Sequence, residues 1–264
     1  MNDKTRVFYI FLSLINVTNS KTIEIDTLQT AREYYKSLED LETIRTVPDT
    51  TSSDTRPIFI SLGFNCECAY QLSKRNLHGA FFPLDWVKTK NFDLICSMIE
   101  NDFRNFLDKT NLIIQDKPCG SCAVVVDKKY MVEFLHDFPL DQKFESSYEV
   151  VKEKYGRRIA RFCNALTTRQ HVYFFRRKNI TRAQAIKFCT LIRQKAPGLQ
   201  FTLIALHNTD EYKRSWNIKN IINFFYQPLD TKKLTWRGDN KFWDLILKKL
   251  GIKSNNLAKA SDTF

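Results

Sequence analysis

The feature that most constrains the fold is an alternation of short apolar runs with longer amphipathic stretches after Pro57. The runs PIFISL, HVYFF and QFTLIAL are rich in β-branched and aromatic residues, which favours buried strands. The stretches between them carry apolar residues at intervals of three and four, which is typical of helices. This alternation predicts an α/β fold, with a largely parallel or mixed sheet flanked by helices.

A hairpin interrupts the alternation. The runs CAVVV and YMVEFLH are joined by Asp127-Lys128-Lys129. His136 is the last residue of the second run, so we expect it at the end of a strand. Sites of α/β sheets gather at the carboxyl ends of strands, which makes His136 a candidate functional residue.

A polar stretch without periodicity, residues 47–57, divides the chain. We expect residues 57–264 to form a single α/β domain of catalytic type. Residues 21–56 are expected to supply a linker and an N-terminal helical arm, with an amphipathic helix at 27–44. Residues 1–20 contain the apolar run VFYIFLSLINV, which fits a signal peptide or a segment packed on the domain. That run is too short to be a transmembrane segment, and no other stretch is long enough.

Charge and cysteine content narrow the partners and the compartment. The net charge of +12 is spread along the chain without a zinc-finger, RNA-recognition or KH pattern, which argues against nucleic-acid binding. Seven cysteines, an odd and dispersed set, favour a reducing, cytoplasmic compartment, with secretion as the alternative if residues 1–20 are a signal peptide. No metal or cofactor is implied, and the expected partner is a peptide or small-molecule substrate.

Cys66 is the residue best placed for chemistry. It follows the run PIFISL and the turn Gly63-Phe64-Asn65, and it opens the helical stretch CECAYQLSKRN. Free backbone N–H groups and the helix dipole favour a thiolate at such a position, and the same donors could hold an oxyanion. Gly63 suits a tight turn, and Asn65 offers a cap or a donor to substrate. A cysteine that merely packs is the alternative.

A nucleophilic thiol needs a base, and imidazole suits neutral pH. Of the four histidines we prefer His136, because it ends an apolar run and Asp137 follows it. His207, at the end of LIALH, is the competitor, whereas His78 is expected to be a capping or surface residue. Asp85, in the segment PLDW, and Asp137 are the candidates for orienting the imidazole.

Arginines could bind an anionic group of a substrate. Arg176 ends the run HVYFFR, where a strand end would aim it at the same rim as Cys66. A predicted helix also carries three arginines whose planar guanidinium groups suit phosphate and carboxylate, although charged helix faces are usually only solvated: Arg157, Arg158 and Arg161.

The segment PCGSC, residues 118–122, resembles a redox pair, a papain-type nucleophile segment and half of a zinc site. Cys122 precedes AVVV, a predicted strand, whereas the redox and papain motifs open helices. No second Cys or His pair completes a zinc site at recognisable spacing. We therefore expect Cys119 and Cys122 to be a packed or incidental pair.

Several of these segments together resemble the DUF1796 family, whose members are described as papain-like cysteine peptidases. The resemblance rests on ISLGFNCECAYQL, FFPLDW, FLHDF, KYGRRIARF and VYFFR, within residues 57–180. It implies that Cys66 is the nucleophile and His136 the base, while Asp85 and Arg176 match further motif positions. The sequence departs at Leu84, where the family usually has Phe.

Two functions follow from the sequence. The first is a cysteine-dependent acyl-transfer enzyme, such as a peptidase or amidase, that uses Cys66 and His136. The second is a non-covalent α/β domain that binds an anionic ligand, such as a nucleotide-sugar or another phosphate compound, through Arg176 or the arginine-bearing helix.

Overall fold

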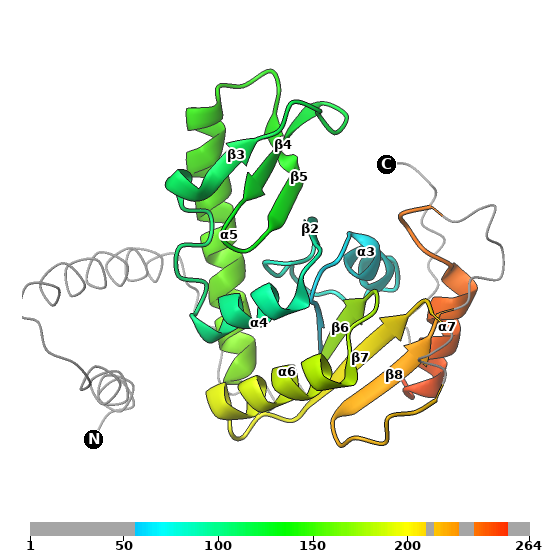
Figure 1. The fold of residues 1–264 in the computed structure, drawn as a ribbon. Helices are drawn as coiled ribbons and strands as arrows, with labels where there is room; N and C mark the ends of the chain where they lie inside the picture. Colours follow the sequence, from blue (N-terminus) through cyan, green and yellow to red (C-terminus); the bar gives the residue numbers. More distant parts are fainter. Residues whose placement is uncertain (1–55, 210–213, 227–234, 253–264) are drawn as a thin grey trace, which may run out of the picture. The chain divides into compact units, whose positions relative to one another are not determined.

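The computed structural model describes residues 56–209, 214–226 and 235–252. The predictions for residues 1–20 and for the arm and linker up to residue 55 lie outside these ranges and stay predictions. Within the described ranges, no helix is long and apolar enough to cross a membrane. The α/β class is confirmed, because a parallel sheet and an antiparallel sheet are both flanked by helices (Figure 1).

The parallel sheet is built from the apolar runs that the sequence analysis identified as strands. Its ladder places Ile58 opposite Val172 and Val172 opposite Phe201. Because every pairing is parallel, the carboxyl ends of the strands share one edge of the sheet. The strands, in their spatial order, are β1 (Ile58–Ser61), β6 (Val172–Arg177), β7 (Phe201–His207) and β8 (Ile221–Phe225).

Helices cover both faces of this sheet. The described α-helices are α3 (Glu67–Lys74), α4 (Phe92–Glu100), α5 (Phe144–Leu166), α6 (Arg182–Lys195) and α7 (Asn240–Lys249). Neighbouring residues of a strand face opposite ways, so Phe174 packs on Phe188 of α6 while Phe175 packs on Trp243 of α7. Two separate apolar clusters result, one on each face of the sheet.

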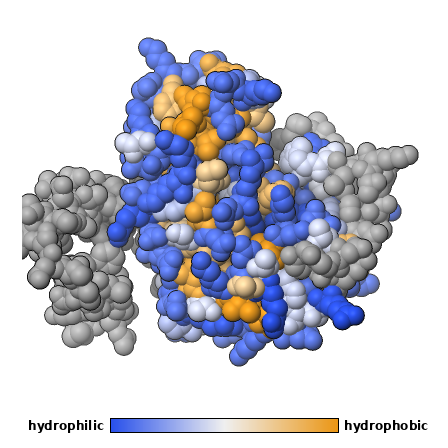
Figure 2. Space-filling view, in the orientation of Figure 1, coloured by the Kyte–Doolittle hydropathy of each residue, from blue (hydrophilic) through white to orange (hydrophobic). Residues whose placement is uncertain are grey.

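A second, antiparallel sheet confirms the predicted hairpin. Two of its strands have only three residues, too few to show a period of two, and the sequence analysis missed them. Ile113 and Ile114 on the edge strand are 46% and 51% exposed, and Figure 2 shows hydrophobic atoms on the surface over this sheet. In spatial order the strands are β2 (Val87–Thr89), β5 (Val132–Pro139), β4 (Cys122–Asp127) and β3 (Leu112–Ile114).

The prediction that His136 ends a strand is wrong. The ladder between β4 and β5 continues past it, with Ala123 opposite Phe138 and Cys122 opposite Pro139. A register shift between Ala123 and Val125 absorbs the irregularity in the pairing, so the strand runs on to Pro139. His136 therefore lies inside β5 and belongs to the antiparallel sheet.

Apolar residues recur at intervals of three and four over residues 92–107, which predicts one helix over that stretch, but the observed helix α4 is shorter. The pattern extends through Leu107, but α4 ends at Glu100 and a 3-10 turn follows later at Lys109–Asn111. Asp102, Phe103 and Leu107 have positive φ angles, which a helix cannot accommodate. Phe103 and Leu107 are nevertheless buried in the core, and their burial explains why the spacing resembled a helix.

Candidate active site at the turn between β1 and α3

The turn that leads from β1 to α3 is shaped by two consecutive residues with positive φ. Gly63 has φ +77°, and a Cβ built there would come within 2.6 Å of Thr89 Oγ1. Phe64 has φ 84°, an angle that costs energy for a side-chain-bearing residue, and its N–H donates to Thr89 Oγ1 at 2.8 Å. Contacts with β2 thus hold the turn in the shape that presents Cys66.

Arg176 lies beneath this turn. Its guanidinium donates to Leu62 O at 2.8 Å and to both the hydroxyl and the carbonyl of Thr89, at 2.7 and 3.1 Å. The residue is 2% exposed, and burial lowers the pKa of its guanidinium to about 10. These contacts join β6, β2 and the turn, and the expected role of Arg176 as a substrate ligand stays a prediction.

The start of α3 is fixed by polar contacts. Asn65 Oδ1 accepts the backbone N–H of Glu67 at 3.1 Å, which is the capping role considered for it. That N–H is thereby taken and does not offer a free donor to an oxyanion. The buried Glu67 carboxylate accepts from Arg177 Nε and Trp243 Nε1, each at 3.1 Å, and so ties α3 to β6 and α7.

The surroundings of Cys66 disfavour its thiolate. The residue is 6% exposed, and burial is the main cause that raises the pKa of its thiol to about 11. Electrostatic interactions with Asp137, Cys119 and Asp85 raise it further, in that order. The expectation of a thiolate at the helix start is therefore wrong for this state, because desolvation outweighs the favourable backbone.

His136 and Asp137 point to different sides of β5, as neighbours on a strand do. His136 is exposed and makes no hydrogen bond or ion pair with any described residue. Asp137 is directed at α5, where it pairs with Lys154 and accepts the Tyr155 hydroxyl at 2.9 Å. No hydrogen bond joins Cys66 to His136 in the described part of the chain, and Asp137 does not orient the imidazole.

His78 is the imidazole that the sequence analysis missed. Its side chain is 1% exposed, and Nε2 lies 3.1 Å from Asp85 Oδ2 while Nδ1 lies 3.3 Å from Ser73 Oγ. Asp85 Oδ2 also accepts the N–H of Phe82 at 2.5 Å. This contact places the FFPLDW loop beside the residues that follow α3. The signal for it in the sequence is that Asp85 lies among aromatic residues.

His207 ends β7, as expected, but it is fully buried against Trp216, with ring centroids 5.0 Å apart. Burial, assisted by the positive charge of Arg177, lowers the pKa of its imidazole to about 4. His207 is therefore neutral at physiological pH and a weak base.

The arginines of α5 meet the FFPLDW loop. Arg158 lies over the rings of Phe81 and Tyr155, and its Nη1 is buried without a hydrogen-bond partner among the described residues. Arg161 donates to the carbonyl of Phe81. Burial and the charges of the neighbouring arginines lower the pKa of Arg161, which shows that the cations of this helix repel one another.

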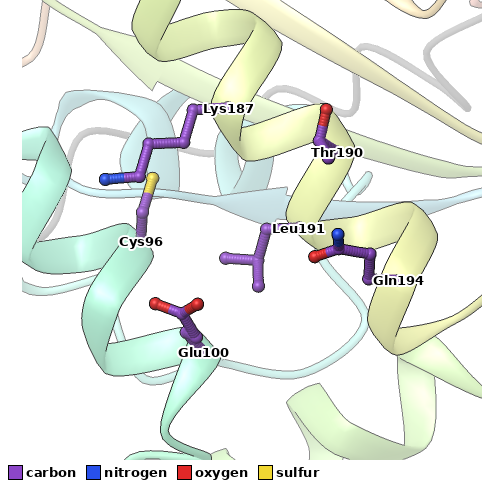
Figure 3. Close-up of a pocket in the computed structure, with 6 residues that line it drawn as sticks. All are labelled: Cys96, Glu100, Lys187, Thr190, Leu191 and Gln194. Atoms are coloured by element: carbon purple, nitrogen blue, oxygen red, sulfur yellow. The ribbon is translucent and has the colours of Figure 1, made fainter.

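A shallow groove of about 190 Å³ lies between α4 and α6, away from this turn (Figure 3). Lys187 from α6 and Cys96 from α4 line one side of it, and Cys66 is not among its lining residues. The groove therefore does not extend the candidate site.

Comparison with known proteins gives a family for the chain. A family model described as "Putative papain-like cysteine peptidase (DUF1796)" matches residues 57–210, more than half of the chain. An uncharacterised protein of Acanthamoeba polyphaga mimivirus, R408, is 29% identical over 222 residues, which cover 74% of this chain and 98% of that protein. No solved structure matches the chain. The matched segment contains both the turn at Cys66 and β5, and the chain belongs to the DUF1796 family.

Proposed function

We propose that the protein is a cysteine-dependent acyl-transfer enzyme, of the peptidase or amidase kind, with Cys66 as nucleophile and His136 as general base. The observation that carries the proposal is the position of Cys66 at the N-cap of α3, directly before the first helical residue and after a strained turn held by β2 and β6. Strain at a turn that presents a nucleophile is commonly part of a site. Family membership supports a cysteine nucleophile within residues 57–210.

The chemistry requires a base during the attack. With a pKa of about 11, the Cys66 thiol is protonated at neutral pH. As the Cys66 Sγ–acyl carbon bond forms and the bond to the leaving group breaks, the base takes the thiol proton and passes it to the leaving group.

His136 suits the role of base better than the other imidazoles. Its ring is exposed and uncommitted among the described residues. Both nitrogens of His78 already have polar neighbours within 3.3 Å. His207 is buried and weakly basic. Asp85 then acts as a positioning residue, because its carboxylate contacts His78 and accepts a hydrogen bond from the FFPLDW loop.

Acylation by p-nitrophenyl acetate tests the nucleophile. We expect release of p-nitrophenolate and an acetyl thioester on Cys66, located by mass spectrometry of the full chain. Cys163 is a matched control, because burial also raises the pKa of its thiol to about 11. Cys66 should react much faster than Cys163 at pH 8, and equal rates would refute the proposal, since pKa alone would then explain the labelling.

A non-covalent anion-binding function is the second candidate, and Arg158 favours it. A buried guanidinium with an unpartnered Nη1, in a helix of mutually repelling cations, is stabilised when an anion binds nearby. Titration with inorganic phosphate, followed by calorimetry, would detect such binding in Cys66→Ala as well as in the wild-type chain. Arg158→Met should abolish it.

A further inference from the structure

The PCGSC segment closes the hairpin between β3 and β4 with a two-residue turn. Cys119 N–H donates to Cys122 O at 2.9 Å, and Cys122 N–H donates to Cys119 O at 3.1 Å. Gly120, the first central residue, has φ +58°, as a type II′ hairpin turn requires. The two cysteines are therefore directly opposite each other, as a hydrogen-bonded antiparallel pair.

This arrangement suits a disulfide. Cα atoms of a hydrogen-bonded antiparallel pair are about 5.5 Å apart, within the range of about 4.4–6.8 Å that disulfides span. Both thiols are free and half-buried, so a small oxidant can reach them. All seven cysteines lie in described residues, and no other two are joined by backbone hydrogen bonds in this way. No group of three or more metal-ligating side chains is present in the described ranges, so these thiols are not part of such a cluster.

We propose that Cys119 and Cys122 are a redox modification site, which forms a reversible intramolecular disulfide by exchange with a small-molecule disulfide such as oxidised glutathione. One cysteine thiolate attacks the glutathione disulfide, forming a mixed disulfide and releasing one reduced glutathione. The second thiolate then attacks the mixed disulfide, so the Cys119–Cys122 bond forms and a second reduced glutathione leaves. Two thiols are oxidised and one glutathione disulfide is reduced. The site is independent of whether Cys66 is a nucleophile.

The test is equilibration of the full chain in glutathione buffers of increasing oxidised fraction, followed by alkylation and tryptic mass spectrometry. Lys117 precedes Pro118, which blocks cleavage, so both cysteines stay in one peptide, residues 110–128. We expect this peptide to resist alkylation and to be lighter by the two thiol hydrogens. Reduction by dithiothreitol should restore both alkylation sites.

Variants that lack one of the two cysteines show whether the reaction with oxidised glutathione depends on the partner thiol. In Cys119→Ser and Cys122→Ser, the remaining cysteine has no partner and should carry glutathione instead. In the wild type the two thiols react within one molecule. The Cys119–Cys122 disulfide should therefore form at a concentration of oxidised glutathione about ten-fold lower than the one that gives the mixed disulfide in the single variants. Cys163→Ser should behave as the wild type. Alkylation of both thiols at the concentration that modifies the single variants would overturn the proposal, as would a bond from either cysteine to Cys66.

Discussion

The two regions that the proposed site combines, the turn at Cys66 and strand β5, differ in how firmly their residues are held. Around the turn, the side chains of Arg176, Asn65 and Thr89 are committed to hydrogen bonds that fix the backbone. On β5, His136 is exposed and has no hydrogen-bond partner among the described residues. The proposed mechanism therefore pairs a fixed nucleophile with an unrestrained base, and catalysis would depend on substrate or motion to bring imidazole and thiol together.

The largest expected effect is on acyl transfer. Cys66→Ala and His136→Ala should each slow p-nitrophenyl acetate turnover by about a hundred-fold or more, because attack needs both groups. The double variant should be little worse than either single one, since members of a catalytic unit are not additive. His136 is exposed, so its replacement should leave the urea midpoint unchanged. Loss of activity in His207→Ala but not in His136→Ala would mean that the base has been chosen wrongly.

The next largest expected effect is a loss of stability when Arg176, which fixes the turn, is replaced. Arg176→Met removes three hydrogen bonds and leaves Leu62 O and Thr89 without their buried donor. We expect a loss of about 3 kcal/mol of stability in urea unfolding. Arg176→Lys keeps the charge but cannot reach both partners, so it should fall between the wild type and Arg176→Met. An unchanged midpoint in Arg176→Met would show that the turn does not depend on this clamp.

Gly63→Ala tests the turn from the backbone side. Its positive φ and the 2.6 Å approach of the new Cβ to Thr89 Oγ1 should together cost about 2 kcal/mol. Gly79→Ala is the matched control, because no atom lies within 4 Å of its Cβ and its φ is not in the left-handed region. That variant should be neutral or slightly stabilising in the same unfolding measurement. Equal stability of the two variants would contradict the close packing of the turn on β2.

The sequence could predict the elements that have a local pattern, and it could not predict those that depend on tertiary packing. Strands β1, β6 and β7 are buried on both faces, so their apolar runs identified them directly. The position of Cys66 at a helix start followed from one strand, turn and helix unit. Strands β2 and β3 are short, and their existence depends on pairing with β5 and β4, which no local pattern records. The contact of His78 with Asp85 and the burial of Arg176 likewise depend on tertiary packing.

The smallest expected effect links the two regions through electrostatics. Asp137 on β5 is the largest of the negative charges that raise the pKa of Cys66, after burial itself. Asp137→Asn removes that charge and leaves the Lys154 cation unneutralised, and both changes favour the thiolate. The pKa of Cys66 should therefore fall, and alkylation by iodoacetamide at pH 8 should quicken by about three-fold.

A graded comparison makes this last effect specific to the site. Asp85→Asn removes a charge that acts on Cys66 less strongly, so it should quicken alkylation of Cys66 less than Asp137→Asn does. Glu133→Gln, on the same strand, is the control for a general change of charge, because Glu133 pairs with Lys88 and Lys90 and is not among the groups that act on Cys66. In the wild type the alkylation rate should keep rising up to a pH of about 11. A midpoint well below 8.5 in the wild type would instead mean that an imidazolium, and not burial and the neighbouring carboxylates, sets the state of Cys66 before substrate binds.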